Sequence, residues 1–153
     1  MNNKLIFTAF IVLALLCQLR VVGQKFNAKQ TFINAQKHIQ LGELNDAIED
    51  LLLYYKNDST NSNVNYLLGL CYYKTDATKK QCIPYLLKVS EVNPTYVESV
   101  VKEKKGSPET YWLLALSQYK NSLFDDALSS LEKYKEFVAN NEERKKDAEK
   151  MTK

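Results

Sequence analysis

Residues 41–48 read LGELNDAI, and residues 121–128 read NSLFDDAL. Each segment begins with a turn and continues with an acidic helix start, an alanine and an aliphatic residue. Gly42 is free to adopt the left-handed conformation that ends a helix. Asp46 and Asp125 fall in the first turn of the following helix, where the helix dipole favours a negative charge. The two segments therefore predict two copies of one helix-turn-helix unit.

Around these copies the sequence contains three such units, at about residues 28–61, 62–94 and 107–140. The expected helices cover about residues 26–41, 44–56, 63–74, 79–92, 108–120 and 124–139. The chain has only 4 glycines and 3 prolines, whereas a β-rich fold needs many turn residues. We therefore expect an all-α fold, an α-solenoid of about three helical hairpins.

Small residues occupy two matching places in each unit. They are Ala35, Gly69 and Ala115 in the first helices, and Ala47, Cys82 and Ala127 in the second helices. Leucines follow the second set one helical turn later, at Leu51, Leu86 and Leu131. This pattern resembles the tetratricopeptide repeat, whose period is about 34 residues. In that family the small residues let paired helices approach closely, so the resemblance implies tightly packed hairpins.

The spacing is irregular between the second and third units. Cys82 and Ala127 are 45 residues apart, which exceeds the period of about 34 residues. The additional stretch, about residues 95–106, contains the apolar residues Tyr96, Val97, Val100 and Val101. Their spacing fits one or two helical turns. We expect a short inserted helix here, or an extension of the preceding helix.

The first 23 residues are interpreted as a secretory signal peptide. Lys4 gives a positive start, and an apolar run follows from Leu5 to Leu16. The run is too short to cross a bilayer, which needs about 20 apolar residues. We expect cleavage after Gly23 and an exported protein that is periplasmic or associated with the outer membrane. A retained anchor and a lipoprotein signal with Cys17 as the lipidated residue are the alternatives.

Charge and motifs exclude several classes of function. Residues 1–23 contain two of the 21 basic residues and none of the 18 acidic ones, so the mature chain has a net charge of +1. No basic stripe remains to follow a phosphate backbone, so nucleic acid is not an expected partner. The sequence has no glycine-rich phosphate loop and no spacing typical of a metal site. We expect no enzyme activity, no cofactor and no metal, and a structural role for His38, the only histidine.

The mature chain keeps two cysteines, Cys71 and Cys82, one on each expected helix of the second unit. Two cysteines in an oxidising compartment are able to pair. A disulfide also needs Cβ atoms about 4 Å apart with the correct torsion. The alternative is that both are reduced, buried packing residues.

The resemblance to tetratricopeptide repeats implies a binding groove, because one face of each first helix lines the concave surface in that family. The matching residues here are Phe32, Tyr66, Leu70, Tyr73, Lys74, Trp112, Leu116, Tyr119 and Lys120. Aromatic side chains supply much of the energy of protein interfaces. A peptide or an adjoining domain is the expected occupant. The alternative is that these side chains pack against the inserted segment or the tail.

More broadly, residues 24–140 resemble the N-terminal module of exported envelope proteins in which such repeats precede a PD40-type β-propeller and an outer-membrane-protein-A-like domain. The resemblance implies a scaffold that binds proteins of the outer membrane or the secretion machinery and meets the membrane only indirectly. A spacer or self-associating array without a peptide ligand is the alternative. The sequence contains no propeller or peptidoglycan-binding domain, so attachment to the cell wall is not implied. Residues 141–153, rich in charge, are expected to form a capping helix or a linker.

Overall fold

The computed structural model of the protein describes residues 26–96, 103–139 and 149–150. The helices are α2 (Ala28–Leu41), α3 (Leu44–Asn57), α4 (Ser62–Thr75), α5 (Ile83–Leu86), α6 (Glu109–Lys120) and α7 (Phe124–Val138). In the described part of the chain, β structure is limited to one isolated bridge between Val92 and Gly106. The predicted all-α fold is confirmed.

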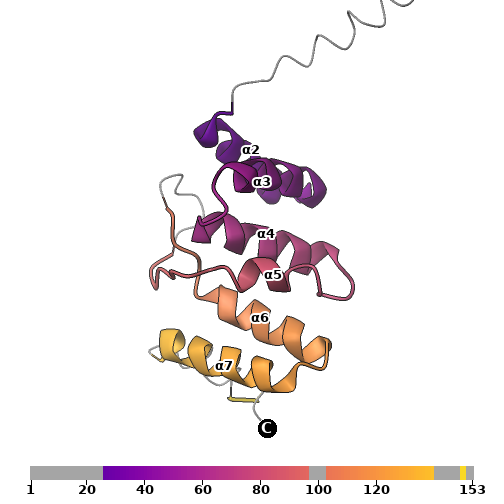
Figure 1. Cartoon of the computed structure of the whole chain (residues 1–153), viewed down its shortest axis with the longest axis vertical. Helices are drawn as coiled ribbons and strands as arrows, with labels where there is room; N and C mark the ends of the chain where they lie inside the picture. Colours follow the sequence, from indigo (N-terminus) through magenta and orange to yellow (C-terminus); the bar gives the residue numbers. More distant parts are fainter. Residues whose placement is uncertain (1–25, 97–102, 140–148, 151–153) are drawn as a thin grey trace, which may run out of the picture.

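The helices stack one after another along the long axis of the molecule (Figure 1). Helices α2 and α3 form one antiparallel hairpin, and α6 and α7 form another. Helix α4 lies between them and packs against α3, α5 and α6. This consecutive packing is compatible with an α-solenoid of helical hairpins.

Local signals explain where the first helices begin and end. The side chain of Asn27 accepts a hydrogen bond from the backbone N–H of Gln30 and so caps the start of α2. Asn61 caps α4 in the same way through the N–H of Val64. Gly42 ends α2 with φ +78°, the left-handed conformation that the sequence predicts.

The second helix of the middle hairpin is much shorter than predicted. A helix was expected over residues 79–92, but α5 spans only Ile83–Leu86. Pro84 lies at the start of α5, where its missing N–H is harmless, whereas a helix beginning at residue 79 would place it in the interior. After α5 the backbone N–H groups of Ser90 and Glu91 donate to Ser62 Oγ instead of continuing the helix.

The helical turns predicted around residues 96–101 fall almost wholly on residues 97–102, which lie outside the described part of the chain. The described residues that follow, 103–106, are not helical. They run beside the residues that follow α5, because Asn93 N donates to Gly106 O at 2.9 Å and Gly106 N donates to Glu91 O at 2.8 Å. The N-terminal end of α4 holds them from the other side, since Asn63 Nδ2 donates to Glu103 O at 2.9 Å.

The small residues pack as the repeat pattern predicts. All six are buried, and so are the leucines that follow the second set: Ala35, Ala47, Leu51, Gly69, Cys82, Leu86, Ala115, Ala127 and Leu131. Gly69 of α4 faces Leu86 of α5 so closely that a Cβ at this position would overlap the leucine side chain. The core therefore forms where small residues let one helix approach the next.

Two predicted segments are not tested by the fold. The signal peptide at residues 1–23 lies outside the described residues. Of the predicted capping helix or linker at residues 141–153, only Glu149 and Lys150 are described, and both are helical. In the described part, no helix is long and apolar enough to span a membrane.

Candidate functional site

The first aromatic residues of the predicted groove lie in the core. Phe32 is 3% exposed and contacts Tyr54 of α3 edge-on, with ring centroids 6.2 Å apart. Tyr66 is 5% exposed and lies against Tyr96, with centroids 5.3 Å apart. Tyr96 is held in place because its hydroxyl donates to Asn63 Oδ1 at 2.5 Å. Phe32 and Tyr66 are both packing residues in this structure: Tyr66 packs against the inserted segment, as in the alternative that the sequence left open, whereas Phe32 packs within its own hairpin.

Trp112 is half-buried and packs on α7. Its ring lies 5.4 Å from that of Tyr134, and both belong to a small apolar cluster between α6 and α7. Only part of its surface is therefore available to a partner. The three aromatic residues expected to begin the groove do not form a continuous exposed ridge.

The remaining residues of the predicted groove follow one sequence pattern on α4 and α6. Each helix carries the pattern Leu-x-x-Tyr-Lys, in residues 70–74 and 116–120. The two helices pack side by side. The leucines and Tyr73 are half-buried, both lysines are exposed, and Tyr119 is 60% exposed. We call these six residues the Leu-Tyr-Lys surface: Leu70, Tyr73, Lys74, Leu116, Tyr119 and Lys120.

Lysines give one edge of this surface a positive charge. Lys120 Nζ donates to the carbonyl of Ala77 at 2.6 Å, which ties α6 to the loop after α4. Lys79 lies over the ring of Tyr73, with Nζ 4.7 Å from the centroid, and also donates to the Tyr73 carbonyl. Burial is the main cause that raises the pKa of Tyr73, and the nearby Cys82 thiol group adds a smaller increase. Tyr73 therefore remains a neutral phenol beside the lysines at physiological pH.

The loop after α4 is ordered by one carboxylate. Asp76 accepts hydrogen bonds from the backbone N–H groups of Thr78, Lys80 and Gln81, and from the Thr78 hydroxyl. These bonds, the one from Gln81 above all, lower the pKa of Asp76 to about 2. The loop thus carries a permanent negative charge at neutral pH, and it holds Lys79 where it meets Tyr73.

The two cysteines are not joined by a disulfide in this structure, and both are buried. Cys82 Sγ lies 3.0 Å from the hydroxyl of Ser117 on α6, so the small residue of the middle hairpin contacts the next hairpin. Burial is the main cause that raises the pKa of the Cys82 thiol. The cysteines here fit the packing alternative rather than the disulfide.

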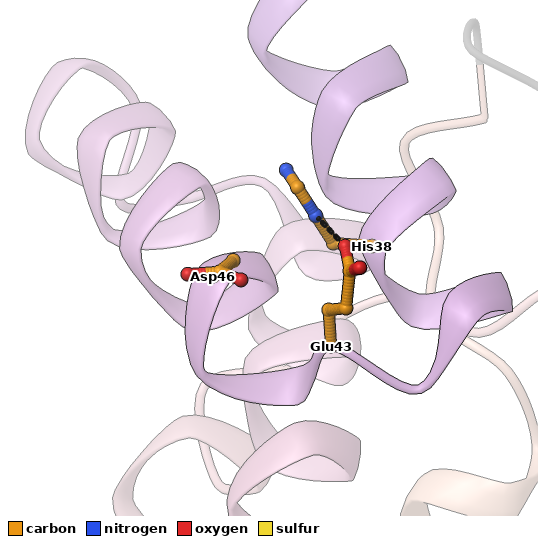
Figure 2. A group of neighbouring side chains, drawn as sticks. All are labelled: His38, Glu43 and Asp46. Atoms are coloured by element: carbon orange, nitrogen blue, oxygen red, sulfur yellow. Dashed lines mark hydrogen bonds and ion pairs between the residues drawn. The ribbon is translucent and has the colours of Figure 1, made fainter.

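A polar cluster closes the turn between α2 and α3. His38 Nδ1 lies 2.7 Å from Glu43 Oε2, and His38 Nε2 lies 3.7 Å from Asp50 Oδ2. Figure 2 shows the imidazole facing the Glu43 carboxylate, with Asp46 on the first turn of α3. Potential ligand atoms of His38, Glu43 and Asp46 lie within 4.8 Å of one another. A divalent cation favours such a set of nitrogen and oxygen ligands, but the direct contact between His38 and Glu43 also explains the geometry.

Charge is concentrated at the same turn. Burial raises the pKa of Asp50; His38 opposes the rise, and the negative charges of Asp46 and Glu49 add to it. A structural role was expected for His38, without any link to these acids. The signal was present, since a histidine in the last turn of one helix precedes a run of acids at the start of the next.

Two open clefts lie at the seams between hairpins. The first, of about 570 Å³, is lined mainly by polar residues of α3, the end of α4 and the loop that follows, including Asn45, Glu49 and Gln81. The second, of about 380 Å³, lies between α5 and the turn that joins α6 to α7. Its apolar lining consists of Ile83, Pro84, Leu87 and Leu123. The second cleft was not predicted, because a longer helix was expected in place of α5.

Comparisons with known proteins give no family for this chain. No family model matches the sequence, and no curated protein is similar to it. The function therefore has to be argued from the chain's own residues.

Proposed function

We propose that the chain is an exported scaffold of tetratricopeptide type that binds a segment of another protein. The proposed binding site is the Leu-Tyr-Lys surface of α4 and α6. The observation that carries this proposal is the repetition of one Leu-x-x-Tyr-Lys pattern on two first helices that pack against each other.

The composition of the surface favours a partly apolar, acidic partner. Tyrosines contribute large contact areas with few rotatable bonds, so they stabilise interfaces at a low entropy cost. Lys74 and Lys120 at its edge, with Lys79 beside Tyr73, are suited to carboxylate groups. The half-buried leucines between the helices supply an apolar floor. An extended or helical peptide that carries acidic residues next to apolar ones fits this arrangement.

The proposed location rests on residues 1–23 and on the resemblance to envelope proteins. In such a compartment a small helical array would link components of the outer membrane or of a secretion apparatus. Mass spectrometry of the mature N-terminus tests the location. A start at Gln24 supports soluble export, whereas a lipid on Cys17 places the protein on a membrane.

The binding proposal is tested by quantitative capture from a cell-envelope extract. The test variant is Tyr119→Ser combined with Lys74→Glu, both at exposed positions. A matched control is Lys56→Glu, because Lys56 is exposed in the last turn of α3 as Lys74 is in the last turn of α4. We expect the wild type and the control to retain the same partners and the test variant to lose them. Equal recovery by all three folded proteins would remove the Leu-Tyr-Lys surface as the binding site.

A further inference from the structure

An apolar strip crosses the seam between the middle and last hairpins. It consists of large side chains that are strongly exposed: Leu87 at 62%, Leu123 at 43%, Phe124 at 58% and Leu128 at 46%. Leu87 and Leu123 line the second cleft. Phe124 and Leu128 are one turn apart on α7 and therefore share a face. We call these four residues the seam strip.

The first hairpin shows what normally covers this face. Leu44 and Ile48 of α3 occupy the places that Phe124 and Leu128 occupy in α7, as the paired segments 41–48 and 121–128 show. Leu44 is half-buried and Ile48 is 8% exposed, because α4 packs against α3. Among the described helices, α7 packs chiefly on α6. The face of α7 that carries Phe124 and Leu128 is therefore apolar like the matching face of α3, but it remains exposed.

The other end of the stack is different. In α4 the residues that lie inside the stack include Leu67, Leu68 and Cys71, each fully buried. The matching residues of α2 are Ile33, Asn34 and Lys37, and all three are exposed. Helix α2 thus presents a largely polar face to water. Stacking of copies end to end would place the seam strip on Asn34 and Lys37, which is unfavourable.

Charge is distributed unevenly along the strip. Its α5 end is flanked by an exposed lysine, Lys80, which lines the same cleft as Leu87. Its α7 end is flanked by two exposed acids, Asp125 and Glu132, which lie on the same side of α7 as Leu128. A strip that is basic at one end, apolar in the middle and acidic at the other end is complementary to itself after a two-fold rotation.

We propose that two copies of this chain associate through the seam strip about a two-fold axis. Leu87 of each copy then covers Leu128 of the other, and Lys80 faces Asp125 across the interface. The dimer presents two Leu-Tyr-Lys surfaces, but self-association does not depend on their binding a peptide.

The first test is the mass of the protein in solution. We expect light scattering coupled to gel filtration to give twice the monomer mass for protein produced from the full sequence, with dissociation on dilution. Leu128→Glu places a charge in the strip and should yield a monomer. Leu53→Glu is the matched control, because Leu53 is a leucine of α3 with 45% exposure against 46% for Leu128. It should remain a dimer.

The second test examines whether Lys80 of one copy faces Asp125 of the other, as the two-fold arrangement requires. Lys80→Glu and Asp125→Lys should each weaken the dimer about tenfold or more, since each brings like charges together. The double variant restores opposite charges and should recover most of the affinity. Four results would each overturn the proposal. The wild type could stay monomeric up to millimolar concentration, or the Leu128 and Leu53 substitutions could have equal effects. The protein could instead form an open series of larger species, or the double variant could fail to recover affinity. The substituted residues lie outside the Leu-Tyr-Lys surface, so capture of a partner is measured separately, and the two surfaces adjoin only where Phe124 contacts Tyr119 among the described residues.

Discussion

Leu86 packs so closely on Gly69 that a Cβ at Gly69 would lie 2.3 Å from Leu86 Cδ2 and 2.6 Å from Leu86 Cγ. Leu86 is 1% exposed, so its side chain has little room to move. Gly69→Ala gains about 1 kcal/mol of helix propensity but overpacks a site where such strain typically costs about 1–3 kcal/mol or more. We expect a net loss of about 1–2 kcal/mol in the free energy of unfolding, measured by urea denaturation.

The control for this prediction removes the neighbour. Leu86→Ala alone should cost about 2–5 kcal/mol, because it leaves a cavity. In that background Gly69→Ala has space for its methyl group, so only the gain in helix propensity remains. The same substitution should therefore destabilise the wild type and stabilise the Leu86→Ala variant. An effect of one sign in both backgrounds would contradict the close packing.

Gly42 tests a different requirement. Its φ of +78° is left-handed, and no atom lies within 4 Å of a Cβ placed there, so any cost of a side chain comes from the backbone alone. We expect Gly42→Ala to lower the free energy of unfolding by about 1 kcal/mol. Gly42→Asn should cost less, because asparagine tolerates this conformation better. Equal losses for the two variants would show that contact, not backbone conformation, is responsible.

The long hairpins could be predicted because their signals are local. Gly42 ends a helix through its own backbone, and Ala47 or Ala127 marks a close approach wherever the helix lies. For α5, the start also has a local signal, because Pro84 is tolerated only at the beginning of a helix. The end of α5 has no such signal. That end depends on Ser62, 28 residues earlier, which accepts the N–H of Ser90 and competes with continued helix.

The same limit applies to the candidate site. The aromatic pattern assigns Tyr66 and Tyr119 to one face of their helices, but a pattern does not say what covers a face. Tyr96 covers Tyr66, and nothing comparable covers Tyr119 among the described residues apart from its edge contact with Phe124. Tyr96 belongs to a stretch that does not follow the repeat, so the burial of Tyr66 could not be read from the repeat pattern.

The loop after α4 should respond to acid. Hydrogen bonds lower the pKa of Asp76 from 3.8 to about 2 in the folded state. A lowered folded-state pKa contributes stability that is present above about pH 4 and is lost as the pH falls toward about 2. We expect Asp76→Asn to destabilise the protein at pH 7 and the difference from wild type to shrink between pH 4 and pH 2.

An NMR titration of the Asp76 side chain provides the direct measurement, with an expected midpoint near 2. Thr78→Val removes one of the donors to Asp76 and should move the midpoint upward. Asp58 is a useful control, because it also accepts hydrogen bonds from a threonine two residues later, the exposed Thr60. Among the described residues, Asp58 accepts no bonds that correspond to those from Lys80 and Gln81 to Asp76. A midpoint near 3.8 for Asp76 would contradict the bonded loop.

The thiols should be unreactive until the protein opens. Cys71 and Cys82 have no exposed surface, and burial raises the pKa of Cys82, which lowers its thiolate fraction. An opening free energy of about 4 kcal/mol slows labelling by a disulfide reagent about a thousandfold relative to the unfolded chain. In denaturant without reductant, both cysteines should react. A disulfide would instead be established if neither cysteine reacts in denaturant and the protein is 2 Da lighter than its reduced form. Ser117→Val separates the causes: it removes the partner of Cys82 while keeping the site apolar, so slow labelling should persist if burial is the reason.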